Sequence, residues 1–271
     1  MESKIDIIYM VAGRSSRFGG KIKQFAEVGP QGEKLIEYSI KQALPAGFSR
    51  IIFIVGNMTE KPFKEFFGNS YLGVPIEYVM QDFDSKERDK PWGTVDALCS
   101  IKNIVKNPFV ICNGDDLYGE NGFRMLINHL KDSKENAVIG YKLRNVLPEI
   151  GSVNRGIFQL DKDDYVLEIK EMFNISKYNL GENNLSQDNF ANMNLIGMHP
   201  ETINLLHDNL VNFKEIYKGD RNKECLIPTE ITKLIQAKKI RMKIYPSQDK
   251  WSGITNPEDA ELVRNSIKTF Y

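Results

Sequence analysis

The sequence predicts a doubly wound α/β fold with a mostly parallel sheet. Short apolar runs alternate with helical patterns through the first half of the chain, at residues 5–11, 51–55, 76–80, 109–112 and 137–141. The run at 51–55 is apolar at every position, which is typical of a strand buried on both faces, as in a parallel sheet. This alternation favours right-handed crossovers, and such sheets bind ligands at the carboxyl ends of their strands.

Helical periodicity fills the gaps between these strands. The first helix starts near Glu33 and ends at Pro45-Ala-Gly; the second covers residues 60–67, and the fourth roughly 121–130. The third opens at Trp92-Gly-Thr, and its apolar face consists of Val95, Leu98, Ile101 and Val105. Residues 82–90 are charged and aperiodic, which predicts a loop.

The second half of the sequence lacks the regular alternation of strand and helix patterns. Residues 156–160 and 165–169 predict a hairpin around a polar turn, and 173–189 predict a long loop. A strand at 193–198 precedes a helix that starts at His199-Pro200. A helix at 228–235 and a strand at 240–245 near the sheet edge follow. The last helix has Asn256 as its predicted N-cap and Pro257 in its first turn.

Composition bounds the function. The 271 residues are 41% hydrophobic and 27% charged with a formal net charge of zero, which suits a globular protein and argues against a nucleic-acid binder. The three cysteines are odd in number and lack metal-ligand spacing, so we expect reduced thiols. The N-terminus lacks a signal-peptide pattern and no apolar run reaches membrane-spanning length, so we expect a cytoplasmic protein without a membrane anchor.

The segment after the first strand combines small and cationic side chains. It contains Ala12, Gly13, Arg14, Ser15, Ser16, Arg17, Gly19, Gly20, Lys21 and Lys23. Small residues let a backbone approach a ligand, and arginine and lysine neutralise phosphate charge. The segment predicts either a phosphate-binding loop at the mouth of the sheet or a flexible basic surface loop, and its pattern alone does not decide.

Two acidic positions are candidate magnesium ligands. Gly114-Asp115-Asp116 follows the strand at 109–112, where one carboxylate can face the cleft and hold Mg²⁺. The alternative is a turn with helix-capping aspartates. Asp249 follows the strand at 240–245 and is either a second carboxylate for the same metal or a solvated loop residue. The P-loop motif of Walker-type NTPases is absent from the sequence.

Several segments, in order, resemble the sugar-phosphate nucleotidyltransferases. The similar segments are Arg17 with Lys23-Gln-Phe-Ala-Glu-Val, Gly93-Thr-Val-Asp-Ala-Leu, Pro108-Phe-Val-Ile-Cys-Asn-Gly-Asp-Asp, the positions Gly156, Glu171 and 192–194, and Trp251-Ser-Gly-Ile-Thr-Asn-Pro-Glu-Asp. The resemblance covers nearly the whole chain. It implies a single Rossmann-like domain over residues 1–271, a three-layer α/β/α structure with a mixed, mostly parallel central sheet. Residues 1–145 would bind the nucleotide and 146–271 the acceptor.

The resemblance also implies a reaction and residue roles. An NTP and a sugar 1-phosphate would give an NDP-sugar and pyrophosphate, with Mg²⁺ as cofactor. Arg17 would hold the leaving phosphates, Lys23 the reacting phosphates, and Asp115, preferred to Asp116, the metal. Ala12, Gly13, Arg14, Ser15, Ser16, Gln81, Gly93 and Thr94 would contact the nucleotide. Gly156, Glu171, Asn192 and Asn194 would line the acceptor pocket. The partners would be small molecules, with a homodimer left open.

Three departures from the family pattern matter. The loop reads Ala12-Gly-Arg-Ser-Ser-Arg17 where the family has Gly-Gly-x-Gly-Thr-Arg. Gly253 occupies the slot of the C-terminal metal aspartate, so Asp249 is the expected substitute. Met172 replaces the usual lysine after Glu171, which leaves room for an acceptor other than a common hexose 1-phosphate. The alternatives are cytidylyl transfer to a non-sugar phosphate or phosphoramide, and a non-catalytic nucleotide-binding subunit.

Overall fold

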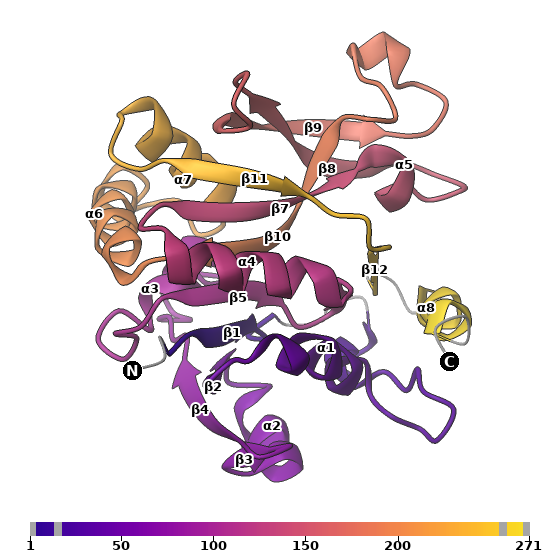
Figure 1. Ribbon diagram of the computed structural model, residues 1–271. Helices are drawn as coiled ribbons and strands as arrows, with labels where there is room; N and C mark the ends of the chain where they lie inside the picture. The colour runs from indigo at the N-terminus through magenta and orange to yellow at the C-terminus, as the bar shows by residue number, and fades with distance from the viewer. Residues whose placement is uncertain (1–3, 14–17, 255–258, 268–271) are drawn as a thin grey trace.

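Helices cover both faces of a mixed sheet in the computed structural model, which describes residues 4–13, 18–254 and 259–267 (Figure 1). The sheet has the order β11-β7-β10-β5-β1-β2-β4-β3, and β8 and β9 extend from it beside β10. The expected three-layer α/β/α architecture with a mixed, mostly parallel sheet is confirmed.

The first half forms the parallel part of the sheet. Neighbouring strands β1 (Asp6–Met10), β2 (Arg50–Val55), β4 (Val74–Met80) and β5 (Phe109–Asn113) all run in the same direction. The short strand β3 (Ser70–Tyr71) closes this end as an antiparallel partner of β4. Because these strands are parallel, the loop after β1, Gln81 after β4 and Asp115 after β5 all leave the same edge of the sheet.

An antiparallel strand separates the two parallel groups. β10 (Phe190–Met198) lies between β5 and β7 (Asn136–Lys142) and is antiparallel to both. β11 (Met242–Pro246) runs parallel to β7 at the sheet edge, as its alternating pattern predicted. The hairpin β8 (Val153–Leu160) and β9 (Val166–Ile175) leads into β10. In Figure 1 this hairpin stands at the opposite end of the molecule from α2 and β3.

Alternating strand side chains feed two apolar cores. On one face, Ile7 and Tyr9 pack with α1 (Leu35–Ala43), α2 (Glu60–Phe67) and α4 (Glu120–Asp132). On the other, Ile8 packs with α3 (Thr94–Cys99), α6 (Pro200–Ile216) and α7 (Ile227–Gln236). Each fully buried large side chain contributes roughly 1.5–3 kcal/mol, so both faces are needed for stability.

Shorter elements complete the fold and modify two expectations. α5 (Leu143–Val146) follows β7, and β6 (Asp116–Leu117) pairs antiparallel with β12 (Ser252–Gly253). The helix expected through Val105 ends at Cys99, and turns bonded from Lys102 N to Cys99 O and from Ile104 N to Ile101 O continue the segment.

The last helix, α8 (Asp259–Ile267), packs beside α1 and β6 in a third, small apolar cluster. Its predicted cap residues Asn256 and Pro257 lie outside the described residues. Among the helices that the structure describes, none combines the length and hydrophobicity needed to cross a membrane.

Candidate active site

Lys23 and Asp115 meet at the carboxyl edge of the parallel strands. Lys23 starts a short 3-10 turn, η2 (Lys23–Phe25), and its Nζ forms an ion pair with Asp115 Oδ2. Gly114 permits this meeting, because a Cβ there would lie 2.4 Å from Val11 Cγ1 and 3.3 Å from Gln24 Cγ. The structure therefore brings together the two charged residues that the sequence placed on separate segments.

Asp116 is buried beside this pair, and its carboxylate oxygen Oδ2 accepts two hydrogen bonds. Asn113 Nδ2 donates over 2.8 Å and the Tyr118 hydroxyl over 3.0 Å. Burial, and secondarily the charge of Asp115, raises the pKa of Asp116 to about 7. A carboxyl group with a pKa near neutrality binds a proton or a cation readily at the pH of a cell.

The space that a side chain at position 253 would need is occupied by Asp116 and Trp251. Gly253 pairs with Asp116 across β12 and β6, and a Cβ there would lie 2.3 Å from Asp116 Oδ1 and 2.6 Å from Trp251 Cζ2. The Asp116 carboxylate thus lies where a side chain at position 253 would start. A side chain at 253 would therefore compete with the Asp116 carboxylate for the same space, a relation that residue identity alone does not reveal.

Asp249 does not line this cavity and contacts the start of α4 instead, while its role as a second metal ligand stays a prediction. Its Oδ2 accepts hydrogen bonds from the backbone N–H groups of Asn121 (2.9 Å) and Gly122 (3.3 Å), and its Oδ1 from Asn121 Nδ2 (2.8 Å). These donors form the start of α4, whose own N-cap position is Gly119. Asp249 is a helix cap supplied from a distant segment.

The expected acceptor residues lie side by side on three adjacent strands. Gly156 is paired with Glu171 on β9 and with Asn192 on β10. At a bulge in β10, Asn192 Nδ2 donates to Asn194 Oδ1 over 3.0 Å, and Asn194 adopts a φ of 61°. Strand register therefore assembles four positions that are up to 38 residues apart in the sequence (156 to 194).

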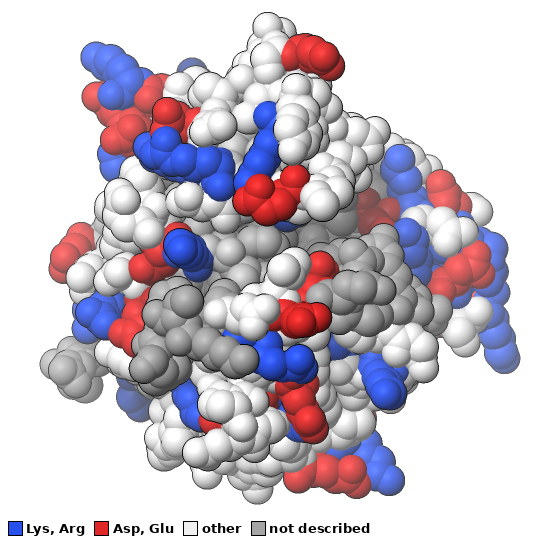
Figure 2. Space-filling model, turned by 90° about the vertical axis from the view of Figure 1, so that its right-hand side faces the viewer, with Lys and Arg blue, Asp and Glu red and all other residues white. Residues whose placement is uncertain are grey.

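One polar cavity joins these residues to the aspartates. It has a volume of about 220 Å³. Its lining residues are Asn113, Asp115, Asp116, Asn154, Arg155, Gly156, Glu171, Asn192, Met193, Asn194, Pro228 and Trp251. Figure 2 looks onto the side of the molecule that carries β12 and α8, where the surface is hollowed and acidic and basic side chains are intermingled. A small polar molecule with a charged end fits these linings.

Arg155 and Trp251 are cavity residues that sequence reasoning did not assign. The Arg155 guanidinium lies 5.2 Å from the centre of the Trp251 ring. Burial raises the pKa of Glu171 on the same wall, and the Arg155 charge opposes that shift. The sequence did contain one indication that Arg155 lies in the cavity, because Arg155 directly precedes the predicted acceptor residue Gly156.

The expected nucleotide residues divide into two groups. Ala12 and Gln81 line an apolar cavity of about 210 Å³, together with Gly56, Asn57, Met58, Phe83 and Pro91. Gln81 Nε2 donates to Gly93 O and to Asp96 Oδ2, both over 3.1 Å. Gly13 is nearby in sequence and would have open space around a Cβ. Arg14, Ser15, Ser16 and Arg17 lie outside the described residues.

Gly93 and Thr94 do not line that cavity and instead hold the segment before α7. A Cβ at Gly93, whose φ is +98°, would lie 2.6 Å from Cys225 O. Thr94 Oγ1 accepts a hydrogen bond from Ile227 N over 3.0 Å. Their arrangement gives these two residues a packing role, whatever they contribute to nucleotide binding.

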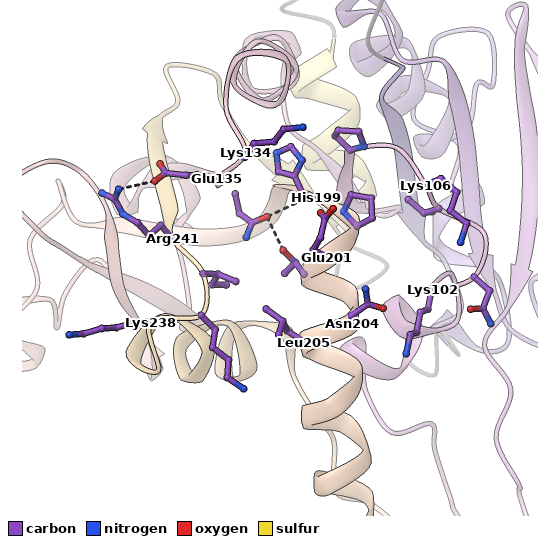
Figure 3. Close-up of a pocket in the computed structure, with 18 residues that line it drawn as sticks. Lys102, Lys106, Lys134, Glu135, His199, Glu201, Asn204, Leu205, Lys238 and Arg241 are labelled. Carbon is purple, nitrogen blue, oxygen red and sulfur yellow. Dashed lines mark hydrogen bonds and ion pairs between the residues drawn. The ribbon is translucent and has the colours of Figure 1, made fainter.

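A larger and more basic cavity lies at the opposite edge of the sheet (Figure 3). It measures about 870 Å³ and sits beside the first residues of β5, β7, β11 and α6. Its cationic lining residues are Lys102, Lys106, Lys134, Lys238, Lys239 and Arg241. Because none of the predicted site residues lines it, we place the chemistry in the smaller cavity.

Comparison with known proteins identifies relatives of this chain. The nucleotidyl transferase family model matches residues 20–171. The bifunctional protein GlmU of Methanococcus maripaludis strain S2 is 28% identical over 173 residues, which cover 62% of this chain but only 35% of that protein. The D-glycero-alpha-D-manno-heptose 1-phosphate guanylyltransferase of Campylobacter jejuni is 25% identical over 166 residues, 60% of this chain and 67% of that one.

Solved structures share the fold over the whole chain. The inositol-1-phosphate CTP transferase from T. maritima superposes with a TM-score of 0.69 at 14% identity and covers 99% of this chain and 97% of its own. The UDP-glucose pyrophosphorylase from Acinetobacter baumanii gives 0.68 at 14% identity, covering 100% and 95%. The nucleotidyl transferase family model matches more than half of the chain, so the chain belongs to the nucleotidyl transferase family.

Proposed function

We propose that the protein transfers a nucleoside monophosphate from an NTP to a small phosphorylated acceptor and releases pyrophosphate. The observation that carries this proposal is the single polar cavity that joins Asp115 to the acceptor-type wall of Gly156, Glu171 and Asn192. The ion pair from Lys23 to Asp115 adds the cation expected beside reacting phosphates.

Asp115 and Asp116 suit a magnesium ion. Both carboxylates line the cavity, and they supply the hard oxygen ligands that Mg²⁺ takes, usually one or two carboxylates together with substrate phosphates. The described residues hold no cluster of three or more acidic, histidine or cysteine side chains, so phosphate and water oxygens would complete the coordination. When bound, the metal would neutralise charge on the triphosphate.

The chain's own groups would position the reactants and stabilise charge. An oxygen of the acceptor phosphate attacks the α-phosphorus, the α–β anhydride bond breaks, and pyrophosphate leaves. Lys23, which pairs with Asp115 here, would bind the phosphate oxygens of the reacting group and stabilise the negative charge that develops on them. Arg17 remains our proposal for binding the leaving phosphates, and the cavity of Ala12 and Gln81 for the base.

The acceptor side favours a phosphate that is held differently from a common hexose 1-phosphate. Met172 provides no charge after Glu171, although Glu171 keeps its place on the cavity wall. Cytidylyl transfer to a non-sugar phosphate is therefore the second candidate function. A cytoplasmic enzyme that acts on soluble metabolites is consistent with either.

Pyrophosphate release measured over a panel of four NTPs, sugar 1-phosphates, inositol 1-phosphate and phosphocholine tests the proposal. We expect Mg²⁺-dependent release with one pair and loss of release in Asp115→Asn. Nucleotide binding without turnover for any pair would refute the enzyme assignment and favour a regulatory nucleotide-binding subunit.

A further inference from the structure

Among the described residues that line the cavity beside Asp115 and Asp116, acidic side chains outnumber cationic ones. Of the described residues that line it, Arg155 is the one lysine or arginine, whereas Asp115, Asp116 and Glu171 are acidic. Like charges in a partly enclosed site repel strongly, because the effective dielectric constant is lower than in water. A phosphorylated molecule that enters here therefore needs cationic partners, which among the described residues are Arg155 on the cavity wall and Lys23, the partner of Asp115.

Arg155 is held without a counter-ion. Its Nη1 donates to Asn154 O over 3.1 Å, and its Nη2 lies 3.5 Å from Val146 O. In the described part of the chain its Nε is buried without an acceptor, and it forms no ion pair with a carboxylate. Burial lowers the pKa of the guanidinium, which agrees with incomplete compensation of its charge. A desolvated cation of this kind is stabilised by an anion.

The neighbouring Trp251 adds a second unsatisfied donor on the same wall. Its indole Nε1 is buried and has no acceptor among the described residues. The Arg155 guanidinium carbon lies over the ring, within the distance of a cation–π interaction. A planar guanidinium can bind two phosphate oxygens at once, a geometry that an ammonium group cannot reproduce.

The strand register shows that position 172 could carry a cation in the same region as Arg155. Arg155 on β8 is paired with Met172 on β9, one residue beyond the pair of Gly156 and Glu171. Side chains directly opposite each other in an antiparallel pair lie on the same face and about 5 Å apart. A lysine at position 172 would therefore reach the same region from the adjacent strand.

We propose that Arg155, backed by Trp251, binds the phosphate of the acceptor and selects phosphate monoesters. This inference deepens the proposed function and rests on it for the identity of the reaction. Glu171 and Asn192 would then contact hydroxyl groups of the same molecule, because they line the cavity beyond Arg155.

A binding experiment tests Arg155 without any turnover. The chain contains two tryptophans, so a Trp92→Phe background leaves Trp251 as the one indole fluorophore. Titration with inorganic phosphate, and separately with glucose 1-phosphate, should change Trp251 emission saturably. In Arg155→Met, the loss of a charged hydrogen-bonding partner should weaken binding roughly 10- to 100-fold, and Arg155→Lys should lose less. Equal affinity in Arg155→Met would overturn the proposal.

The control for folding is the urea midpoint of each variant, which should stay close to that of the Trp92→Phe background. If Arg155→Met unfolds, the second test is Arg155→Lys, which keeps the charge but not the two-point geometry. Arg155→Lys that binds phosphate as tightly as the parent protein would overturn the proposed two-point binding.

Moving the positive charge from position 155 to position 172 tests the role of Arg155 in the reaction. With the substrate pair found by the pyrophosphate assay, Arg155→Met should raise KM for the acceptor roughly 10- to 100-fold and leave KM for the NTP within about twofold. Arg155→Met combined with Met172→Lys should recover much of that loss, because the lysine enters the same region. An equal rise in both KM values, or no recovery in the double variant, would show a structural role and overturn the proposal.

The two hypotheses fail in different ways. A wild-type protein that binds phosphate through Arg155 but turns over no substrate pair would refute the proposed function alone. A protein that catalyses the reaction normally after Arg155→Met would refute the role of Arg155 alone.

Discussion

Replacing Asp249 separates the two roles that this residue has been given. Asp249→Ala removes the carboxylate that accepts the hydrogen bonds from the start of α4. A helix cap should affect the free energy of unfolding, whereas a metal ligand should affect the Mg²⁺ dependence of turnover. We expect the former effect and not the latter.

The magnitude follows from the donors involved. Asn121 and Gly122 carry the second and third backbone N–H groups of α4, the donors that an N-cap side chain normally satisfies. Loss of such a cap costs about 0.5–2 kcal/mol, and loss of a negative charge at a helix N-terminus about 0.3–1 kcal/mol. The free energy of unfolding should therefore fall by about 2 kcal/mol, equivalent to roughly 4–8 °C in Tm.

Urea and thermal unfolding measure this change, with two matched variants. Asp249→Asn keeps an acceptor and loses the charge, so its loss should be about 0.5–1 kcal/mol. Asp132→Ala removes an exposed carboxylate at the opposite end of α4, where the helix dipole disfavours it. That control should change the free energy of unfolding by less than about 0.5 kcal/mol.

Two results would refute this reasoning. One is an Asp249→Ala protein as stable as wild type. The other is a normally stable variant whose half-saturating Mg²⁺ concentration rises more than about tenfold, which corresponds to 1.4 kcal/mol of lost metal binding.

Three further changes address the site and its support. Gly93→Ala should lower the free energy of unfolding, measured in urea, by about 2–4 kcal/mol, because Gly93 has a positive φ and its new Cβ would clash with Cys225 O. The control is Gly181→Ala, where a Cβ would enter open space, and equal effects of the two substitutions would contradict the packing role of Gly93. In EDTA, the contribution of Asp116 to the free energy of unfolding should fall as pH rises from about 4 to 7, because the folded pKa of Asp116 is raised to about 7 and folding therefore favours its protonated form. Asp116→Asn should flatten that part of the thermal unfolding profile, and an unchanged slope would exclude Asp116 as its source. Lys23→Met should slow pyrophosphate release roughly 100- to 1,000-fold, and Asp115→Asn combined with it should slow release little further if the pair acts as a unit; independent, additive losses would argue against a shared role.

Local sequence patterns predicted most helices and strands, because strands that are buried on both faces consist of continuous apolar runs. β2 and β5 are apolar at nearly every position, since α-helices cover the sheet on both sides. The bounds of α2 were predicted correctly from residues 60–67. The place of β10 between β5 and β7 was not predictable in this way, because pairing partners depend on contacts between distant segments.

The same limit explains which contacts of the site residues the fold class predicted and which it did not. The segment after β1, which carries Lys23 in η2, and Asp115 after β5 leave the same edge of the sheet because β1 and β5 are parallel neighbours, so the fold class already placed them near each other. The hydrogen bond from Asn121 to its capping residue Asp249 joins positions 128 residues apart. Arg155 packs against Trp251, almost 100 residues later in the chain, and local sequence patterns do not reveal such contacts. An aspartate beside a tryptophan in sequence resembles a ligand, but its hydrogen-bond partners decide its role.

The close approach of Gly253 to Asp116 also constrains how this lineage can change. An ancestor with a larger residue at 253 needs a different side-chain position at 116, since one space holds the carboxylate of only one of them. A single substitution at either position would therefore meet an occupied site or leave it without a carboxylate. Positions 116 and 253 should vary together among descendants, and grafting either residue into a relative should succeed only when both are exchanged.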